Sequence, residues 1–463
     1  MTNEQYHNLI IGSGEAGKYL AWNLAKMGQT TAVVERSMIG GSCPNVACLP
    51  SKNIIHSAKA VALADPTTGL GVMTGSFKVD MSGVARRKSM MVNGLVDLHL
   101  ANFKASGAEL IMGEARFTEP KTVQLMLNGG GSRQLRGDRV FLCVGTRASI
   151  PDVPGLTDSG PMTHVDALNL ERLPEHLVIL GGGYVGLEFA QAMRRFGSRG
   201  TIVQRGRQLL DREDPEVSQA LLELMKDDGV QVLLQAEVLS VAGRSGDNVT
   251  LKIRSGTSES LVEASDILVA AGRTPNTDRL DIARGGVELD SRGYIRVNEK
   301  LQTSATDVWA MGDCAGSPQF THAGYDDFRI VLNNLAGGNR STRGRLIPYC
   351  LFTDPELARV GMSESEAKAK NVPYRVAKVP MSSVPRMQTL SQTRGFAKAL
   401  IGTDNQILGF TVFGAEASEL MAVAQTAMLG GMPFTAFRDA IFTHPTAAEG
   451  LIVLFTSGFA GAK

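Results

Sequence analysis

Two stretches of the chain share one order of apolar and polar segments. Each begins with a short apolar run, passes through a glycine-rich turn into a segment with helical spacing of apolar residues, and ends in a second apolar run. The first covers residues 7–36 and the second residues 176–205. The pattern predicts a strand, a helix and a strand in each stretch, which is the unit of a doubly wound parallel sheet.

Both turns carry the spacing G-x-G-x-x-G. Its positions are Gly12, Gly14 and Gly17 in the first stretch, and Gly181, Gly183 and Gly186 in the second. Glycines with this spacing let the backbone approach a pyrophosphate, which then lies at the positive end of the helix. A tight turn that binds nothing is the alternative, but two such turns, each between a strand and a helix, favour two dinucleotide sites.

The two stretches end differently. The first ends in Glu35, and a carboxylate there can accept hydrogen bonds from a ribose diol, as both NAD and the AMP half of FAD require. The second ends in Gln204, followed by Arg205 and Arg207. With no carboxylate at the end of this stretch, the two arginines favour binding of a 2′-phosphate, and therefore of NADPH over NADH. The alternative is that they are solvated surface charges.

The remaining pattern is mixed. Residues 65–77 are expected to form a loop, residues 116–146 to alternate as strands, residues 396–414 to form strands and residues 419–429 to form a helix. The part after residue 345 has no glycine-rich phosphate turn, so we expect it to serve another purpose.

Composition narrows the partners and the compartment. A net charge of +1 gives no electrostatic reason to bind nucleic acid or anionic lipid. The polar N-terminus predicts neither a signal peptide nor a membrane span. Five cysteines are too few for a secreted disulfide scaffold, and we therefore expect a cytoplasmic protein.

The segment GGSCPNVACLP holds Cys43 and Cys48 five positions apart. A zinc site needs four ligands, and no second cysteine pair lies nearby in the sequence. In a regular helix the two Cα atoms would lie roughly 8–9 Å apart, beyond the ~4.4–6.8 Å of a disulfide. A disulfide therefore requires a distorted first helical turn, and Pro44 and Asn45 are residues that would distort one.

In sequence order, the motifs GGSCPNVACLPSK, CVGTRASIP, GGGYVGLE, AAGRTPN, TSATDVWAMGDCAG and HPTAAEG span the chain. With them the chain resembles the class I flavoprotein disulfide reductases, the family of dihydrolipoamide dehydrogenase, glutathione reductase and mercuric reductase. The resemblance implies an α/β fold with two Rossmann-like domains, for FAD and NAD(P), and a C-terminal α+β dimerisation domain. The implied division is 1–150 (FAD), 151–275 (NAD(P)), 276–344 (central, completing the FAD site) and 345–463 (interface).

The resemblance also implies roles for single residues. Cys43 would exchange with substrate, and Cys48 would face the flavin as a charge-transfer thiolate, with its pKa lowered at a helix start. Lys52 would approach the reactive nitrogen of the flavin and pair with Glu188. Tyr184 would cover the flavin until nicotinamide displaces it.

Further cofactor contacts follow from the same motifs. Asp313 would hydrogen-bond the ribityl chain of FAD. The remaining expected contacts with FAD are Ser42, Ala115 and Gly145, and those with the nicotinamide nucleotide are Val238 and Gly272.

His444 precedes Glu449 by five residues, the spacing that the family uses for an acid–base dyad. Histidine titrates near neutral pH, and a carboxylate orients its ring and stabilises its charged form. In the family this dyad comes from the partner subunit, so the resemblance implies a homodimer with a shared active site. His322 matches the position of a histidine near the flavin in dihydrolipoamide dehydrogenases.

The expected function is FAD-dependent transfer of electrons from NADPH or NADH through Cys43 and Cys48 to a disulfide or small oxidant. The alternative is reduction of a metal ion such as mercury(II) or copper(II), with the two cysteines as a pair of thiolate ligands. Part of the sequence resembles mercuric reductases and a bacterial subgroup linked to copper(II) reduction. The reverse reaction, as a dithiol oxidase, and a non-catalytic flavin redox sensor are further hypotheses. No metal cofactor is expected.

Overall fold

The first strand–helix–strand unit forms as its pattern predicts. The computed structural model describes residues 4–64, 70–71, 75, 77–457 and 459, so most of the loop expected at 65–77 lies outside the described residues. In the first unit, β1 (Glu4–Ile11) leads through a turn to α1 (Glu15–Lys26) and β2 (Thr31–Glu35). β1 pairs in parallel with β2, with Ile11 opposite Val34.

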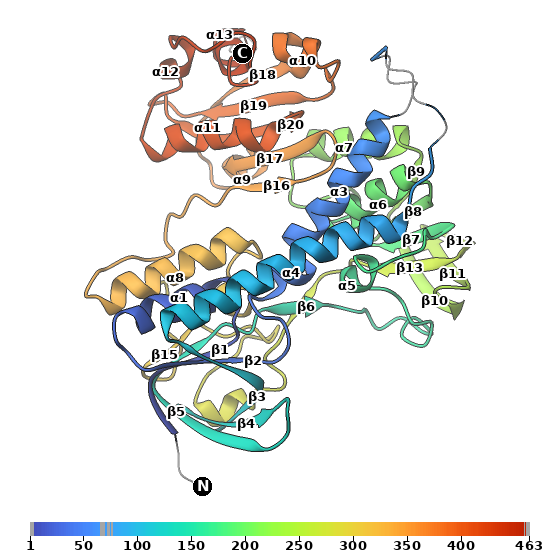
Figure 1. Cartoon of the computed structure of the whole chain (residues 1–463). Helices are drawn as coiled ribbons and strands as arrows, with labels where there is room; N and C mark the ends of the chain where they lie inside the picture. Colours follow the sequence, from blue (N-terminus) through green and yellow to red (C-terminus); the bar gives the residue numbers. More distant parts are fainter. Residues whose placement is uncertain (1–3, 65–69, 72–74, 76, 458, 460–463) are drawn as a thin grey trace.

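The sheet around this unit has six strands in which a parallel part continues into an antiparallel meander (Figure 1). Its other strands are β3 (Glu109–Glu119), β4 (Thr122–Leu127), β5 (Ser132–Leu142) and β15 (Val308–Ala310). The helices of this part are α2 (Ser42–Val46), α3 (Cys48–Leu63), α4 (Met81–Ser106) and α8 (Thr321–Leu335), with 3-10 helices η2 (Ile282–Gly285) and η3 (Gly312–Ala315). The strands expected over residues 116–146 are thereby confirmed.

The second unit builds a four-stranded parallel sheet in the order β13–β7–β8–β9. Its strands are β7 (His176–Leu180), β8 (Arg199–Gln204), β9 (Val230–Leu234) and β13 (Asp266–Val269), with α5 (His164–Ala167), α6 (Tyr184–Phe196) and α7 (Pro215–Asp227). An antiparallel sheet of β10 (Ala236–Arg244), β11 (Asn248–Ser255) and β12 (Ser258–Ala264) is attached to it, and β6 (Thr146–Ala148) pairs with β14 (Arg273–Pro275).

The glycines of the two turns pack alike, which explains the repeated spacing. Gly12 and Gly181 have φ of +100° and +116°, and a Cβ on either would lie 2.4 Å from a backbone carbonyl oxygen of the neighbouring strand connection. A Cβ on Gly17 or Gly186 would lie 2.1 Å from the carbonyl oxygen of Gly12 or Gly181, respectively. The first and third glycines therefore allow strand and helix to pack closely in both units.

The C-terminal part has its own antiparallel sheet, which lies apart from the parallel sheets in Figure 1. The strand order is β16 (Tyr349–Leu351), β17 (Glu356–Gly361), β20 (Ile407–Gly414), β19 (Phe396–Ile401) and β18 (Arg375–Pro380). Its helices are α9 (Glu364–Ala369), α10 (Pro385–Thr389), α11 (Ala417–Leu429), α12 (Thr435–Arg438) and α13 (Gly450–Ser457), with η4 (Met381–Ser383). The strands expected at 396–414 and the helix at 419–429 are confirmed.

A fully buried ammonium group joins this sheet to α7. Lys398 Nζ lies 2.8 Å from Asp214, 2.5 Å from Glu216 and 3.1 Å from Glu364. The three carboxylates are close enough together to hold a metal ion, but the ammonium group lies among them and pairs with each. Separating the C-terminal sheet from α7 would leave the Lys398 ammonium group buried without its partners Asp214 and Glu216, which is strongly unfavourable. The cluster therefore holds the C-terminal sheet against the second parallel unit.

None of the helices in the described part of the chain combines the length and apolar character needed to cross a membrane.

Candidate active site

The two cysteines lie where α2 ends and α3 begins. The helices are separated at Ala47, whose φ of −136° and ψ of −111° are not helical, so the distorted turn predicted from the sequence is present. The Asn45 side chain donates hydrogen bonds to the carbonyl oxygens of Ile39 (2.9 Å) and Gly41 (2.7 Å) and so fixes the preceding turn.

This segment contacts the first glycine-rich turn directly. Gly41 has φ of +80°, and a Cβ there would lie 2.5 Å from the Cα atom of Gly14. Only glycine fits such an approach in the left-handed region. The cysteines are therefore held beside the turn that we expect to bind a pyrophosphate.

Cys48 is the first residue of α3, and its thiol has two hydrogen-bond partners. One is the thiol of Cys43, and the other is the Thr321 hydroxyl, with Sγ and Oγ1 3.3 Å apart. The hydrogen bond from Cys43, with those from Thr321 and the charge of Lys52, lowers the pKa of Cys48 to about 6, although burial opposes the shift. The same contact and burial raise the pKa of Cys43. Cys48 is therefore the thiol of this pair that ionises first.

An ion pair lies next to Cys48. Lys52 Nζ lies 2.9 and 2.8 Å from the carboxylate oxygens of Glu188, and Glu188 also accepts a hydrogen bond from the Phe352 backbone N–H at 2.9 Å. Glu188 is buried. The predicted pairing of Lys52 with Glu188 is present, and it brings α3 and α6 together.

Tyr184 is the first residue of α6 and packs edge-on against two aromatic rings. Its ring centroid lies 6.3 Å from that of Phe320 and 5.9 Å from that of Tyr349. The Tyr184 hydroxyl lies 3.4 Å from Glu213, which also accepts a hydrogen bond from the Tyr349 hydroxyl. Burial raises the pKa of Tyr184. No sequence pattern indicated Tyr349 and Glu213, because they lie far from Tyr184 along the chain.

Among the described residues, His322 forms no hydrogen bond with either cysteine. Its Nε2 lies 2.7 Å from the carbonyl oxygen of Pro348, and its ring stacks on Phe320 at an interplanar angle of 13°. The neighbouring Thr321 makes the contact with Cys48 instead.

The residues around the first turn suit a dinucleotide in most respects. At the middle glycine, Gly14, only one atom lies within 4 Å of the position that a Cβ would occupy, at 3.7 Å, so its backbone is open to a ligand. Asp313 accepts a hydrogen bond from the Thr146 hydroxyl at 2.6 Å on one oxygen, which leaves its other oxygen for a ligand hydroxyl. Gly145 has φ of +64° and is open, and Ser42 is exposed at the start of α2. Ala115 is buried in β3.

Glu35 ends β2 beside this turn, and protein donors already surround its carboxylate. Ser13 donates from its backbone N–H (2.9 Å) and hydroxyl (2.7 Å), and the backbone N–H groups of Ser37 and Met38 donate at 2.9 and 3.0 Å. Four bonds use the roughly four lone-pair sites of a carboxylate. Contact with a ribose diol therefore requires that one of these bonds be exchanged.

The second turn is flanked by free cations. Gln204 ends β8 and accepts a hydrogen bond from the Gly182 backbone N–H at 3.0 Å. Arg205 and Arg207 are exposed, and among the described residues neither side chain has a hydrogen bond or an ion pair. The middle glycine, Gly183, has no atom within 4 Å of a Cβ position.

The other two residues expected near the nicotinamide nucleotide lie at irregular points of the backbone. Gly272 has φ of +121° with open space at its Cβ position. Val238 lies in β10 at an irregularity in the pairing with β11.

His444 and Glu449 form a pair at the far end of the C-terminal part. His444 Nδ1 lies 2.9 Å from both carboxylate oxygens of Glu449, and the histidine side chain is 65% exposed. Within the single chain the structure gives His444 no contact with Cys43 or Cys48 among the described residues. In Figure 1, α12 and α13, which flank the dyad in sequence, lie away from α1 and α8.

Comparisons with known proteins agree with this architecture. Residues 6–327 match the family model of the pyridine nucleotide-disulphide oxidoreductases, and residues 347–453 match the dimerisation domain of the same family, which supports a homodimer. The chain is 34% identical over 459 residues to the probable pyridine nucleotide-disulfide oxidoreductase RclA of Escherichia coli, covering 98% of this chain and 99% of RclA. It is 32% identical over 457 residues to a mercuric reductase of Acidithiobacillus ferrooxidans, covering 97% and 82%.

The fold is that of a solved relative. The copper(II) complex of the HOCl-induced flavoprotein disulfide reductase RclA from Escherichia coli superposes with a TM-score of 0.89 at 33% identity, covering 98% of this chain and 99% of that one. The chain therefore belongs to the pyridine nucleotide-disulphide oxidoreductases, flavoprotein enzymes that use FAD and NAD(P)H.

Proposed function

We propose that this enzyme uses NAD(P)H to reduce a disulfide or a similar small oxidant at Cys43 and Cys48. The observation that supports this most is the placement of the two cysteines, because Cys48 lies at the start of α3 with its sulfur 3.3 Å from the Thr321 hydroxyl, while Cys43 lies in α2 just before it. FAD, when bound, supplies the two-electron carrier between nicotinamide and the cysteine pair. The four-part division at residues 150, 275 and 344 is part of this proposal.

The chemistry of the thiols follows from their order. The sulfur of Cys43 attacks one sulfur of the substrate disulfide, forming a mixed disulfide and releasing the first product thiolate. The thiolate of Cys48 then attacks the sulfur of Cys43, which closes the Cys43–Cys48 disulfide and releases the second product thiolate. The dyad of His444 and Glu449, supplied by the partner subunit, takes the proton of Cys43 and gives it to the first leaving thiolate. It then passes one proton from solvent to the second. Each turnover thus consumes two electrons from the cysteine pair.

An acceptor screen tests this function. Oxidation of NADPH and NADH by the FAD-loaded enzyme would be followed with lipoamide, glutathione disulfide, mercury(II) and copper(II) as acceptors, in wild type and in Cys43→Ser. We expect a disulfide to be reduced, with the activity lost in Cys43→Ser. Turnover of no acceptor would contradict an enzymatic role and favour a redox sensor.

Reduction of a metal ion is the second candidate, since the RclA structure that superposes on this chain is a copper(II) complex. Two thiols within hydrogen-bonding reach of each other can also serve as a soft ligand pair. Metal reduction that depends on both cysteines, without reduction of any disulfide, would favour this candidate.

The ionisation of Cys48 predicts a pH dependence. Because the pKa of Cys48 is lowered to about 6, the thiolate is present above that pH and is protonated as the pH falls through it. In the two-electron-reduced enzyme, we expect the thiolate–flavin charge-transfer absorbance to be at its full value near pH 8. It should fall to half of that value near pH 6. Replacing Thr321 with valine removes one hydrogen bond to the thiolate and should move this midpoint upward. An absorbance independent of pH between about 5 and 8 would contradict the lowered pKa.

The free arginines predict a preference for NADPH. The double variant Arg205→Gln with Arg207→Gln should raise the KM for NADPH by about 10- to 100-fold, as expected for the loss of charged hydrogen bonds to a 2′-phosphate. The KM for NADH should change by less than about threefold, since NADH has no such phosphate. Arg244→Gln, an exposed change at the far end of β10, serves as the control. Equal effects on both nucleotides would assign the arginines a general role instead.

A further inference from the structure

In each glycine-rich turn, the backbone N–H of the second residue donates a hydrogen bond to the side chain that ends the next strand, but that side chain differs between the two units. In the first unit, a carboxylate oxygen of Glu35 accepts the backbone N–H of Ser13 at 2.9 Å. In the second, the amide oxygen of Gln204 accepts the backbone N–H of Gly182 at 3.0 Å. Gln204 therefore reproduces the hydrogen bond of the acidic residue without its charge.

A carboxylate returns to this position from farther along the chain. The amide nitrogen of Gln204 donates to both oxygens of Asp211, at 3.2 and 3.1 Å. Gly206 packs closely against this contact. A Cβ at Gly206 would be 2.3 Å from an Asp211 oxygen and 2.7 Å from the Gln204 amide nitrogen. The loop between Gln204 and Asp211 is thus folded so that an exposed negative charge lies beside Gln204.

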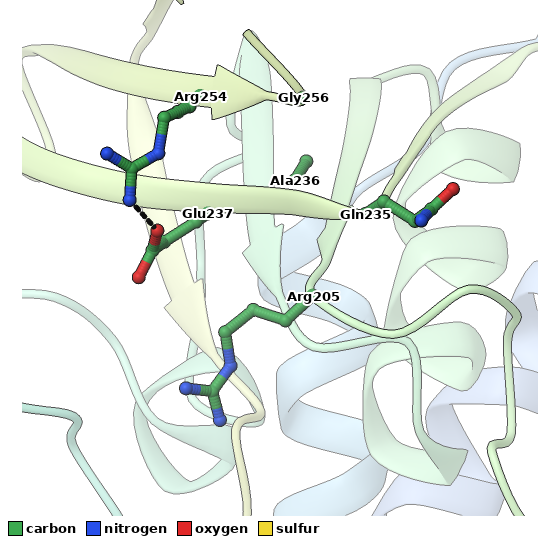
Figure 2. Close-up of a pocket in the computed structure, with 6 residues that line it drawn as sticks. All are labelled: Arg205, Gln235, Ala236, Glu237, Arg254 and Gly256. Carbon is green, nitrogen blue, oxygen red and sulfur yellow. Dashed lines mark hydrogen bonds and ion pairs between the residues drawn. The ribbon is translucent and has the colours of Figure 1, made fainter.

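The cations near this loop are not equally available. A hollow of about 310 Å³ is lined by Arg205 together with Gln235, Ala236, Glu237, Arg254 and Gly256 (Figure 2). Glu237 forms an ion pair with Arg254, whereas Arg205 extends from the loop on the other side of the strand and has no such partner among the described residues. The backbone N–H of Gln235 donates to the carbonyl oxygen of Gly206 at 2.9 Å, so the hollow is attached to the loop that carries Asp211.

We propose that Asp211 is a specificity-determining residue for the nicotinamide nucleotide, and that it limits the preference for NADPH that Arg205 and Arg207 create. This inference rests on the proposed function, since it requires the adenosine ribose to lie at the end of β8. Gln204 then takes the position of Glu35, and Asp211 supplies the carboxylate beside it. The Asp211 carboxylate can accept a hydrogen bond from the 2′-hydroxyl of NADH, and it repels the 2′-phosphate of NADPH.

Two variants test the inference by different means. Asp211→Asn removes the charge and keeps an amide that can still bond Gln204. Gly206→Ala keeps the charge and forces it away from Gln204, because the added methyl group would lie within 2.3 Å of the carboxylate. The measurement is kcat/KM for NADPH and for NADH, with the same acceptor, at low and high salt. Asp247→Asn, in the turn at the far end of β10, is the matched control.

We expect the ratio of kcat/KM for NADPH to that for NADH to rise by about 5- to 30-fold in Asp211→Asn, from the loss of one repulsive charge near a dianion. The increase should shrink at high salt because exposed charges are screened. Gly206→Ala should shift the ratio in the same direction, and Asp247→Asn should leave it unchanged.

If the Asp211→Asn enzyme is active and its NADPH-to-NADH ratio of kcat/KM stays within about twofold of wild type, this inference is wrong but the proposed function stands. Such a change is smaller than that expected for removal of a nearby charge. A wild-type enzyme that oxidises neither nucleotide would instead overturn the proposed function, and this inference with it.

Discussion

Replacing Cys48 with serine is expected to abolish both disulfide reduction and the long-wavelength absorbance of the two-electron-reduced enzyme. Cys48 is the thiol with the lowered pKa, and in the proposed sequence it closes the disulfide with Cys43. Loss of a residue that acts as part of a catalytic unit lowers kcat by roughly four orders of magnitude or more. Steady-state turnover and anaerobic visible spectra measure the two effects in one preparation.

Two companion variants show whether this effect belongs to Cys48. Cys43→Ser should lose turnover equally but keep the thiolate of Cys48. It should therefore show the long-wavelength absorbance before any reductant is added, and lose it when two electrons reduce the flavin, because no disulfide remains to accept them. Cys350→Ser should keep both properties, although Cys350 is also half-buried and lies on β16. Survival of the long-wavelength absorbance in Cys48→Ser would mean that the assignment of the two cysteines is wrong.

Replacing His444 with glutamine is expected to lower kcat for disulfide reduction by about 10²- to 10⁴-fold, the range for loss of a general acid–base group. The rate at which NADPH reduces the enzyme in a single turnover should stay unchanged, because the dyad acts only on the thiols. Stopped-flow measurement of the first step, together with steady-state turnover, separates these effects. A parallel loss in both steps would indicate that His444 holds the structure rather than transfers protons.

Mixing of subunits tests whether the dyad serves the partner. Co-expressed Cys43→Ser and His444→Gln chains form mixed dimers in which one site has both defects and the other has none, if the site is shared. The mixture should then regain about a quarter of wild-type activity, since half of the dimers are mixed and one of their two sites is intact. No recovery would place each dyad with the cysteines of its own chain.

The sequence was sufficient for the parts of the fold that depend on local pattern. Both glycine-rich turns lie between a strand and a helix as predicted, because the first and third glycines make backbone contacts that no other residue permits. A distorted turn in this segment was also predicted, but it lies at Ala47, whereas Pro44 and Asn45, the residues expected to cause it, are helical residues of α2.

Contacts between distant segments could not be predicted in the same way. Thr321 lies 273 positions from Cys48 in the sequence, and a lone threonine carries no pattern that reveals such a contact. The neighbouring His322, which the resemblance placed near the flavin, has its Nε2 2.7 Å from the carbonyl oxygen of Pro348. Tyr349 and Glu213 likewise contact Tyr184 only through the packing of β16 against the second unit.

The nucleotide preference shows the same limit. Gln204, Arg205 and Arg207 are close together in the chain, so their charge could be judged from the sequence. The carboxylate that opposes them comes from Asp211, and only the folded loop places it beside Gln204.

Anaerobic titration of the FAD-loaded enzyme with NADPH, followed by visible absorbance, tests most directly whether the cysteine pair receives the electrons. The proposed function predicts a long-wavelength band that is complete after two electrons, as Cys43 and Cys48 become reduced and the Cys48 thiolate forms. Bleaching of the flavin absorbance without that band would show that the cysteines are not in redox contact with the flavin, and would contradict the proposed function.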